Sequence, residues 1–195
     1  MKHRHPARLA PAVLAIGLTV VASEAHAYEA AVFGAIGGGV FGDDEGSLGK
    51  GLSFAAGVEL RPSSRFGFEA ELERYEHERR FGFGSVVEGD GWLVSGNLLY
   101  HFSEGGLQPY LLGGLGLLSA SYEWRRPIFT GESPFESAGT EVSVTDERGL
   151  AMSFGGGMKV FLTEQLSLRP QARFFSGTDS YLTRLEVTVG LSYHW

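Results

Sequence analysis

The last eleven residues of the chain, Leu185 to Trp195, alternate between apolar and polar side chains without a break. Successive side chains of a β-strand point to opposite faces, so this period of two predicts a strand with one apolar and one polar face. The strand ends on an aromatic residue at a chain terminus, where ordinary chains fray. Closure of a barrel, in which the last strand pairs with the first, explains such an ending.

This final strand also resembles a known targeting sequence. Thr188, Gly190, Tyr193 and Trp195 match the C-terminal signal of outer-membrane barrels, which consists of a polar residue, a glycine, an aromatic residue and a terminal aromatic residue. Phenylalanine is the commonest last residue in that family, so Trp195 is a variant of the pattern. The resemblance implies recognition by the barrel assembly machinery. An ordinary amphipathic last strand is the alternative that these eight positions leave open.

Residues 1–27 have the pattern of a secretory signal peptide. Three basic residues among the first eight precede an apolar stretch over 9–22, and residues 25–27 (Ala-His-Ala) give the small-x-small cleavage pattern. The apolar stretch is short and contains Pro11, which argues against a membrane-spanning helix. A retained N-terminal anchor is the alternative. We expect cleavage after Ala27 and a single outer-membrane domain over 28–195.

The rest of the chain is acidic and has no cysteine. Removal of residues 1–27 takes away three of the 16 basic and one of the 23 acidic residues, which leaves a net charge of 13 − 22 = −9. An acidic chain without a basic tract argues against binding of nucleic acid. The absence of cysteine excludes a disulfide framework. No later segment reaches the ~20 apolar residues of a membrane helix, so a membrane would have to be crossed by strands.

Seven further segments have the character of strands, and turn signals separate them. The first, over Glu29–Phe41, is rich in small residues and its facing is ambiguous. The other expected strands cover residues 52–61, 66–73, 94–102, 110–124, 150–162, 166–174 and 185–195. The total of eight is even, as bacterial barrels of this kind require. Pro170 removes a backbone donor from its strand, and we expect a local bulge there.

The connections between the expected strands alternate in length. Those after the second, fourth and sixth strands are short turns, whereas the others are longer and more polar, with the longest at about 125–148. Short periplasmic turns and long outer loops produce this asymmetry when both termini lie in the periplasm.

Alternation alone does not say which face points inward. A soluble eight-stranded barrel of the lipocalin type would bury the apolar face around a ligand, whereas a membrane barrel turns it toward lipid. In the expected fifth strand the apolar face is assigned to the even positions, which include Tyr110 and Leu112. Aromatic residues near both ends of the strands favour the membrane barrel, because they suggest two girdles. They are Phe41, Tyr75, Trp92, Tyr122, Trp124 and Phe174 on the loop side, and Phe66, Phe102, Tyr110, Tyr193 and Trp195 on the turn side.

The polar face carries charges of both signs. They are Glu59, Glu69, Glu71, Glu73 and Glu186 against Lys159, Arg169, Arg173 and Arg184. Side chains fill the interior of a small barrel, so charges there must pair. We predict a lumenal charge network that joins the third-strand glutamates to the seventh-strand arginines. Solvated outer charges of a soluble barrel are the alternative.

Over residues 28–195 the chain resembles the small outer-membrane barrels, namely the transmembrane domain of outer membrane protein A and the opacity-type and adhesin-type proteins. The resemblance lies in Pro109-Tyr110, in the run Gly113–Gly116 and in Arg169-Pro170 to Phe174. It implies an all-β fold, an eight-stranded antiparallel up-and-down transmembrane barrel in contact with outer-membrane lipid and lipopolysaccharide. It also implies a structural or surface-interaction role through outer loops, whose partner the sequence does not name. A narrow channel for small solutes is the alternative, which a filled lumen disfavours.

His101 and Ser103 invite comparison with lipid A deacylases, which are eight-stranded barrels with a His-x-Ser pair and a Glu on the lipid-facing surface. A serine nucleophile needs a base within hydrogen-bonding distance. Here the pair lies beside a short turn, and His101 has lumenal parity, so neither residue would reach an outer-leaflet lipid. We therefore expect no catalytic residue, and a deacylase is the least favoured alternative.

The acidic residues 43–45 could bind a divalent ion or bridge to lipopolysaccharide phosphates through one. Three adjacent carboxylates do not give the six to eight spaced oxygens of a calcium site, so we expect a solvated loop. His77 and His194 are too isolated to suggest a metal site, and no nucleotide or zinc motif occurs. We expect neither a metal nor another cofactor.

Overall fold

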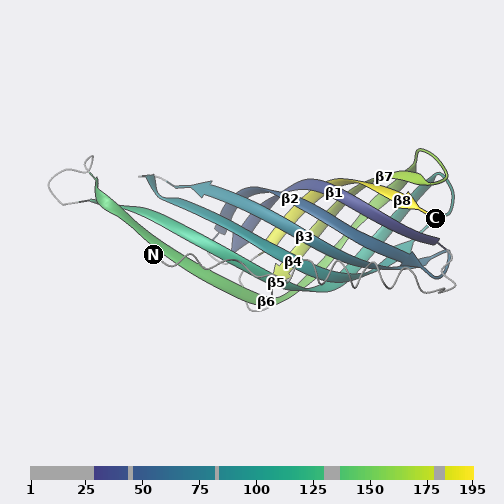
Figure 1. Ribbon diagram of the computed structural model, residues 1–195, viewed down its shortest axis with the longest axis horizontal. Helices are drawn as coiled ribbons and strands as arrows, with labels where there is room; N and C mark the ends of the chain where they lie inside the picture. The colour runs from purple at the N-terminus through teal and green to yellow at the C-terminus, as the bar shows by residue number, and fades with distance from the viewer. Residues whose placement is uncertain (1–28, 44–45, 82–83, 130–136, 178–182) are drawn as a thin grey trace.

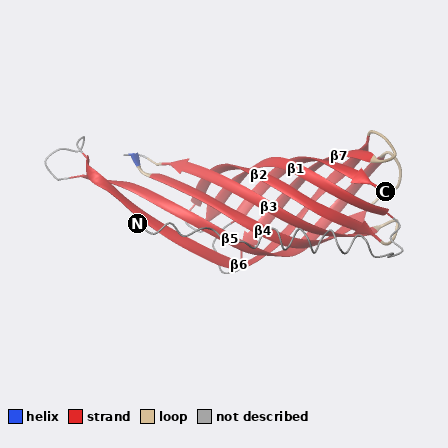
Figure 2. Cartoon of the chain, in the orientation of Figure 1, coloured by secondary structure: helices blue, strands red, loops and turns tan. Residues whose placement is uncertain are grey.

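The computed structural model of the chain describes residues 29–43, 46–81, 84–129, 137–177 and 183–195. Eight antiparallel strands pair in sequence order and close into a barrel (Figures 1 and 2), so the predicted all-β fold is confirmed. The strands are β1 (Glu29–Asp43), β2 (Gly46–Arg61), β3 (Phe66–Arg80), β4 (Val86–His101), β5 (Leu107–Phe129), β6 (Ser137–Phe161), β7 (Leu166–Gly177) and β8 (Thr183–His194). The predicted signal peptide, 1–27, lies outside the described residues and stays a prediction.

The two terminal strands close the sheet. β8 pairs with β1 from Ala31 opposite His194 to Gly42 opposite Thr183. Beyond the last ladder pair, Trp195 N donates to Ala30 O at 3.0 Å, and Ala30 N donates to Trp195 O at 3.3 Å. The terminal aromatic residue is therefore held by backbone hydrogen bonds, which is how the chain end avoids fraying.

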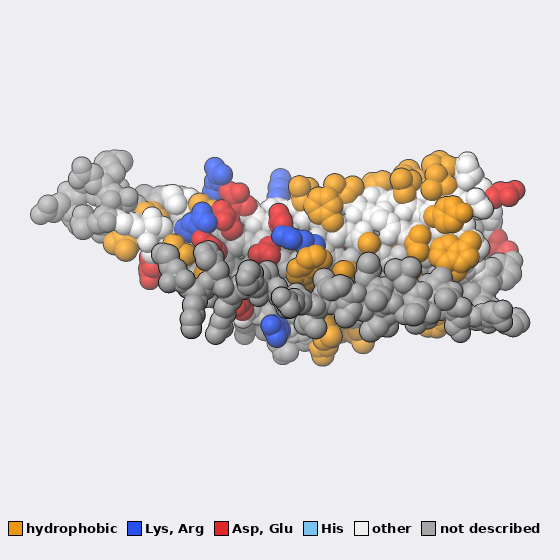
Figure 3. All heavy atoms as spheres, viewed as in Figure 1, with side chains coloured by type: hydrophobic (Ala, Val, Ile, Leu, Met, Phe, Trp, Pro, Cys, Tyr) orange, Lys and Arg blue, Asp and Glu red, His pale blue; other side chains and the backbone are white. Residues whose placement is uncertain are grey.

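The apolar face of most strands points outward. Along β8 the odd-numbered residues from Leu185 to Tyr193 are exposed, whereas the even-numbered residues from Arg184 to His194 are buried in the barrel. The same facing holds in β2, β3, β4, β6 and β7, as their alternation predicts. Figure 3 shows hydrophobic side chains over the part of the barrel near the short turns, and charged side chains beyond it. An apolar exterior around a polar interior is the arrangement of a membrane barrel.

The predicted facing of β5 is wrong. Tyr110 and Leu112 point inward, where Leu112 is only 4% exposed and packs with Leu99. The lipid-facing residues are the odd-numbered ones, and they include Leu111 and Leu115. The error has a simple cause: β5 is apolar on both faces, so apolarity did not distinguish them. The register with β4, which sets His101 opposite Tyr110, fixes the true facing.

The aromatic girdles are only partly as predicted. At the short-turn end Phe66, Phe102, Tyr193 and Trp195 are exposed on the outer face, and the ring of Tyr100 contacts Phe66 and Phe102. At the other end Trp92 points outward, and Phe174 is half-buried beside Phe154. The remaining predicted girdle residues lie inside the barrel or over its mouth: Phe41, Tyr75, Tyr110, Tyr122 and Trp124. The position of an aromatic residue near a strand end therefore does not show whether its side chain points outward or into the barrel.

The strands run far into segments that the sequence predicts as polar loops. β3 and β4 pair up to Arg80 opposite Val86, and β5 and β6 pair up to Phe129 opposite Ser137. In Figure 1 the β5–β6 hairpin extends furthest from the barrel. Water covers both faces of a hairpin outside the membrane, so the apolar alternation disappears while backbone pairing continues. The three short connections at the opposite end are confirmed, at 62–65, 102–106 and 162–165.

The bulge expected at Pro170 does not occur. The ladder of β6 and β7 runs to Gly157 opposite Gln171 and resumes at Val160 opposite Leu168 in the same register, so no residue is inserted. Pairing with β8 continues through Pro170 opposite Val189. Pro170 interrupts the pairing on one side only. Within the described part of the chain, no helix is long and apolar enough to span a membrane.

Candidate functional site

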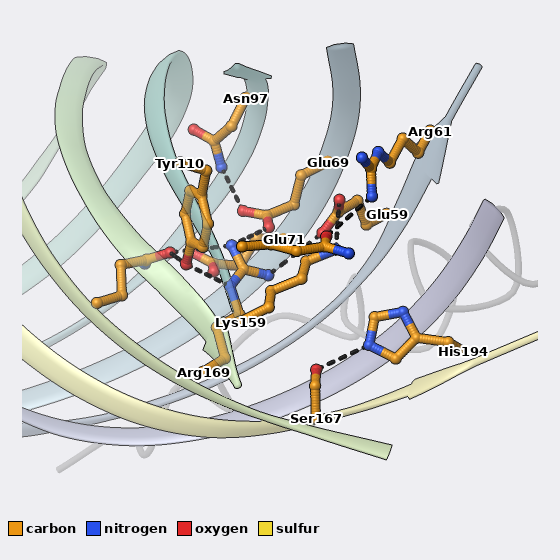
Figure 4. Close-up of polar contacts among 12 residues, drawn as sticks. Glu59, Arg61, Glu69, Glu71, Asn97, Tyr110, Lys159, Ser167, Arg169 and His194 are labelled. Atoms are coloured by element: carbon orange, nitrogen blue, oxygen red, sulfur yellow. Dashed lines mark hydrogen bonds and ion pairs between the residues drawn. The ribbon is translucent and has the colours of Figure 1, made fainter. Parts of the chain in front are cut away.

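The lumen is filled in layers, and the first lies at the short-turn end. Arg61 Nη1 donates to Glu29 Oε2 at 2.9 Å and to Gln108 Oε1 at 2.9 Å. On the other side of Glu29, His194 Nδ1 lies 2.5 Å from Oε1, and His194 Nε2 lies 2.8 Å from Ser167 Oγ (Figure 4). These contacts join β2, β1, β8 and β7 at the place where β1 and β8 close the barrel.

Ser167, His194 and Glu29 have the order of a nucleophile, a base and an orienting carboxylate. The sequence did not reveal this trio, because its members lie on three strands. Ser167 has no exposed surface, however, so a substrate carbonyl has no approach to Oγ. The contacts of Arg61 with Glu29 instead add to a closed interior network. The arrangement joins β7, β8, β1 and β2 where the barrel closes.

The second layer combines two carboxylates with the cations of β6 and β7. Glu59 Oε1 accepts from Lys159 Nζ at 2.8 Å and lies 3.2 Å from His101 Nε2. Glu69 Oε2 lies 2.5 Å from Arg169 Nη2, while Glu69 Oε1 accepts from the amide of Asn97 at 3.0 Å (Figure 4). Because each buried carboxylate has a cation beside it, the layer satisfies the pairing that a low-dielectric interior demands.

Tyr110 is part of the same layer, and this explains its inward facing. Its hydroxyl accepts from Arg169 Nε at 2.7 Å and donates to Gln171 Oε1 at 2.7 Å. Gly157 lies directly opposite Tyr110 in the ladder, and a Cβ there would be 2.5 Å from the hydroxyl. The glycine therefore leaves room for the ring.

Two further pairs complete the charged core. Arg173 Nη2 donates to Glu71 Oε1 at 2.6 Å and to Oε2 at 2.8 Å. One step further along, Arg184 donates to Glu73 Oε2 at 2.7 Å and lies 3.1 Å from Glu186 Oε2. Ser53 also donates to Glu186. These contacts link β3 with β7 and β8 through the centre of the barrel.

An aromatic cap closes the lumen above the charges. We use this name for Phe41, Tyr75, His77, Leu93, Leu118, Tyr122 and Phe175. The ring of Phe41 stacks on His77 at 4.6 Å, and the guanidinium of Arg184 lies 4.1 Å from the ring of Phe175. Arg184 thus joins the top charged layer to the cap by a cation–π contact. A cavity beside the cap, lined by its residues and by Arg184, has a volume of only about 10 Å³, which is room for about one water.

The structure places all eight residues of the predicted lumenal network inside the barrel: Glu59, Glu69, Glu71, Glu73, Lys159, Arg169, Arg173 and Glu186. Glu69 and Glu71 meet seventh-strand arginines, whereas Glu73 meets Arg184 of β8. Sequence reasoning missed Glu29, Arg61, Asn97 and Tyr110 as members. The parity of Arg61 in β2 was the available signal, because it matches that of Glu59.

The residues considered for other chemistry do not come together. His101 is buried in the lumen beside Glu59, whereas Ser103, in the turn between β4 and β5, donates to Leu107 O at the start of β5. Neither side chain lies on the lipid-facing surface of the strands. Asp44 and Glu45 lie outside the described residues, as does the side chain of Asp43. Among the described residues, no group of three or more His, Asp and Glu could hold a metal ion.

The outer end of the barrel exposes a different surface. The protruding part of β2 to β6 carries both signs of charge around an open groove of about 600 Å³, lined by Lys50, Arg74, Glu76, Glu78, Glu88, Asp90, Glu123 and Val144 among others. Arg125 bridges Glu123 at 2.6 Å and Glu88 at 3.3 Å, so exposed ion pairs cross from β4 to β5. Val142 and Val144 of β6 lie beside them and are 54% and 61% exposed.

The chain matches the family described as "Outer membrane protein beta-barrel domain" over residues 12–194 and belongs to that family. It is therefore an outer-membrane β-barrel. A comparison with curated proteins found no match.

Solved structures of small outer-membrane barrels share its fold. Neisserial surface protein A is 16% identical, with a TM-score of 0.63 over 84% of this chain and 96% of that one. Ail, the attachment invasion locus protein of Yersinia pestis, is 13% identical, with a TM-score of 0.59 over 86% and 98%. OprG of Pseudomonas aeruginosa is 12% identical, with a TM-score of 0.52 over 87% and 97%. At these identities the likeness concerns the fold.

Proposed function

We propose that this barrel acts at the cell surface, where its outer hairpins, and above all β5–β6, contact partners outside the cell. The role is structural and adhesive, in the manner of opacity-type proteins, and involves no enzymatic step. The outward apolar face contacts outer-membrane lipid. The exposed charged residues at the outer end of the barrel contact lipopolysaccharide. Nucleic acid is not a partner. Residues 1–27 direct export and are then cleaved, which the mass of the mature protein would test.

The length of the β5–β6 hairpin carries the proposal. β7 stops pairing with β6 at Gly177 opposite Ala151, but β5 and β6 continue together to Phe129 opposite Ser137. At ~3.3 Å per residue, the extra strand is about 45 Å long before tilt is considered. A chain that served only as a membrane anchor would not need a paired hairpin of this length. The hairpin holds exposed side chains well away from the lipid.

The filled lumen supports this role over the channel. Charged layers run from Arg61 to Arg184 and the aromatic cap covers them, so opening a path would break several buried ion pairs together. Breaking such a pair costs about 3–5 kcal/mol. The function therefore belongs to the outer surface.

Adhesion of whole cells tests the proposal. The outer part of the hairpin, residues 122–145, is replaced by an Asn-Gly turn between Ser121 and Asp146, which face each other in the ladder. Cells that express the full chain should adhere to epithelial monolayers or to matrix-coated surfaces more than empty cells do, and the trimmed variant should lose this gain. Heat-modifiable migration in gels confirms that both barrels are folded. No gain with the full chain, or an undiminished gain with the trimmed chain, overturns the proposal.

A further inference from the structure

The strand β6 has one unpaired side where it leaves the barrel. Between Gly139 and Gly149 it pairs with β5, while the ladder to β7 begins only at Ala151. Among the described residues, no strand lies along the other side of this segment, and Figure 1 shows β6 as the border of the protruding sheet. We call residues 139–149 the β6 edge. Its backbone N–H and C=O groups on that side have no strand partner in the described chain.

The sequence of the β6 edge lacks the strongest of the features that protect such borders. Exposed edges are normally blunted by proline, by charged side chains, above all lysine, by a bulge or by shortness, because an unpaired edge can bind another strand. The β6 edge, Gly-Thr-Glu-Val-Ser-Val-Thr-Asp-Glu-Arg-Gly, contains neither proline nor lysine. The irregularity of the β5–β6 ladder lies at Ile128/Phe129, outside the β6 edge. The central residues Val142 to Thr145 are β-branched or small and favour a strand.

The two faces of the β6 edge differ in chemistry. On the outer face Val142 and Val144 form an exposed apolar pair. On the opposite face Glu141 and Glu147 flank two hydroxyl residues. An added strand would set its side chains beside both faces in alternation, so it would need apolar residues on one face and basic residues on the other.

Charge argues against a second copy of this chain as the added strand. The β6 edge contains Glu141, Asp146 and Glu147 against Arg148, a net charge of −2. Two copies would bring the same excess of negative charge into one contact, which like-charge repulsion disfavours. A strand that carries lysine or arginine would gain attraction from the same groups.

We propose that the β6 edge is the part of the hairpin that binds the partner, and that it binds an extended, basic segment of a partner protein by addition of a strand. This proposal rests on the proposed function and names the mode of contact: backbone hydrogen bonds provide the affinity, and alternation of apolar and basic side chains provides the selectivity. The partner segment lies with its apolar side chains beside Val142 and Val144.

Hydrogen exchange with a defined peptide tests strand addition. The full chain in detergent micelles is mixed with a blocked peptide of about ten residues in which Val and Lys alternate, long enough to span the β6 edge. Amide exchange, followed by mass spectrometry, should slow within residues 139–149. Two further peptides carry N-methyl groups either on every Val or on every Lys. Only one set of N–H groups can face β6, so one of these peptides should lose binding and the other should keep it.

Matched charge variants give the second readout. Glu141→Lys/Glu147→Lys should weaken binding of the peptide by about tenfold, whereas Glu104→Lys/Glu164→Lys, with the same change of charge at the short-turn end, should not. Equal weakening by both variants, or equal binding of both N-methylated peptides, overturns strand addition. Slowed exchange of residues 139–149 without peptide, rising with protein concentration, would instead assign the β6 edge to a second copy. If trimming abolishes adhesion but the peptide experiments show no strand addition, the proposed function stands and only strand addition is rejected.

Discussion

At the scale of the residue, the pair of Glu71 and Arg173 is the most direct test of the charged interior. Both side chains are buried, and two hydrogen bonds join them. Arg173→Met keeps the volume but leaves a buried carboxylate alone, so the free energy of unfolding should fall by about 3–5 kcal/mol. Urea unfolding in lipid vesicles measures the change.

Two controls belong to this measurement. Arg74→Ala removes a cation of similar size whose ion pair with Glu76 is exposed, and it should cost about 1 kcal/mol or less. The double variant Glu71→Leu/Arg173→Met should recover most of the loss, because no charge is then left unpaired. Equal costs for Arg173→Met and Arg74→Ala would contradict the assignment of the pair to a dry interior.

A second residue-scale prediction concerns the space beside Tyr110. A Cβ at Gly157 would lie 2.5 Å from the Tyr110 hydroxyl and 2.6 Å from Pro170 O, whereas a Cβ at Gly96 would meet nothing within 4 Å. Gly157→Ala should therefore lower the free energy of unfolding by about 1–3 kcal/mol. Gly96→Ala should leave it unchanged or raise it slightly, by up to about 1 kcal/mol. The same urea titrations measure both variants. A larger loss of stability for Gly96→Ala than for Gly157→Ala would contradict the packing beside Tyr110.

At the scale of the element, the sequence predicted the strands that have one clearly apolar face and missed what depends on their surroundings. In β8 and β3 the apolar and polar positions alternate clearly, so their facing was predicted correctly once the barrel was placed in a membrane. β5 is apolar on both faces, so only its pairing with β4 shows that Leu112 is interior. The extensions of β5 and β6 were read as a loop, because pairing in water needs no apolar face. The cap residues Phe41 and Tyr75 were assigned to lipid, since a strand end gives no sign of direction.

The terminal strand makes an element-scale prediction that separates recognition from folding. Tyr193 and Trp195 are exposed on the outer face with their rings 6.4 Å apart, so neither fills the interior. If the assembly machinery reads these rings together with Thr188 and Gly190, Tyr193→Ala/Trp195→Ala should lower the amount of folded barrel in the outer membrane. Refolding of the purified variant in detergent should remain efficient, because the backbone bonds of Trp195 to Ala30 do not need the side chain.

Leu185→Ala/Val187→Ala is the matched control for that variant. It removes two outward side chains of similar exposure from the same strand and leaves the terminal rings in place. Quantitative blotting of outer-membrane fractions, with heat-modifiable migration as the measure of folding, compares the two. Equal loss for both variants would mean that general apolarity of β8, and not the terminal signal, governs assembly.

At the scale of the whole molecule, the interior and the exterior have separate tasks. Six carboxylates, on Glu29, Glu59, Glu69, Glu71, Glu73 and Glu186, meet the five cations Arg61, Lys159, Arg169, Arg173 and Arg184 inside a barrel that is just wide enough for side chains. The near balance of charge explains how so many ionic groups remain buried together. It also fills the barrel, so the long hairpins extend from a base whose interior is occupied by side chains.

A filled barrel should not conduct ions. Purified full-length protein inserted into planar bilayers is expected to give no steady conductance steps, because an ion would have to displace both the Glu71–Arg173 pair and the rings of Phe41 and Tyr75. A detergent blank gives the background, and a general porin run in parallel shows that the assay detects an open pore. Steps of constant size from this chain but not from the blank would mean that the charged layers rearrange into a path, and the channel would then replace the adhesive barrel as the best account of the fold.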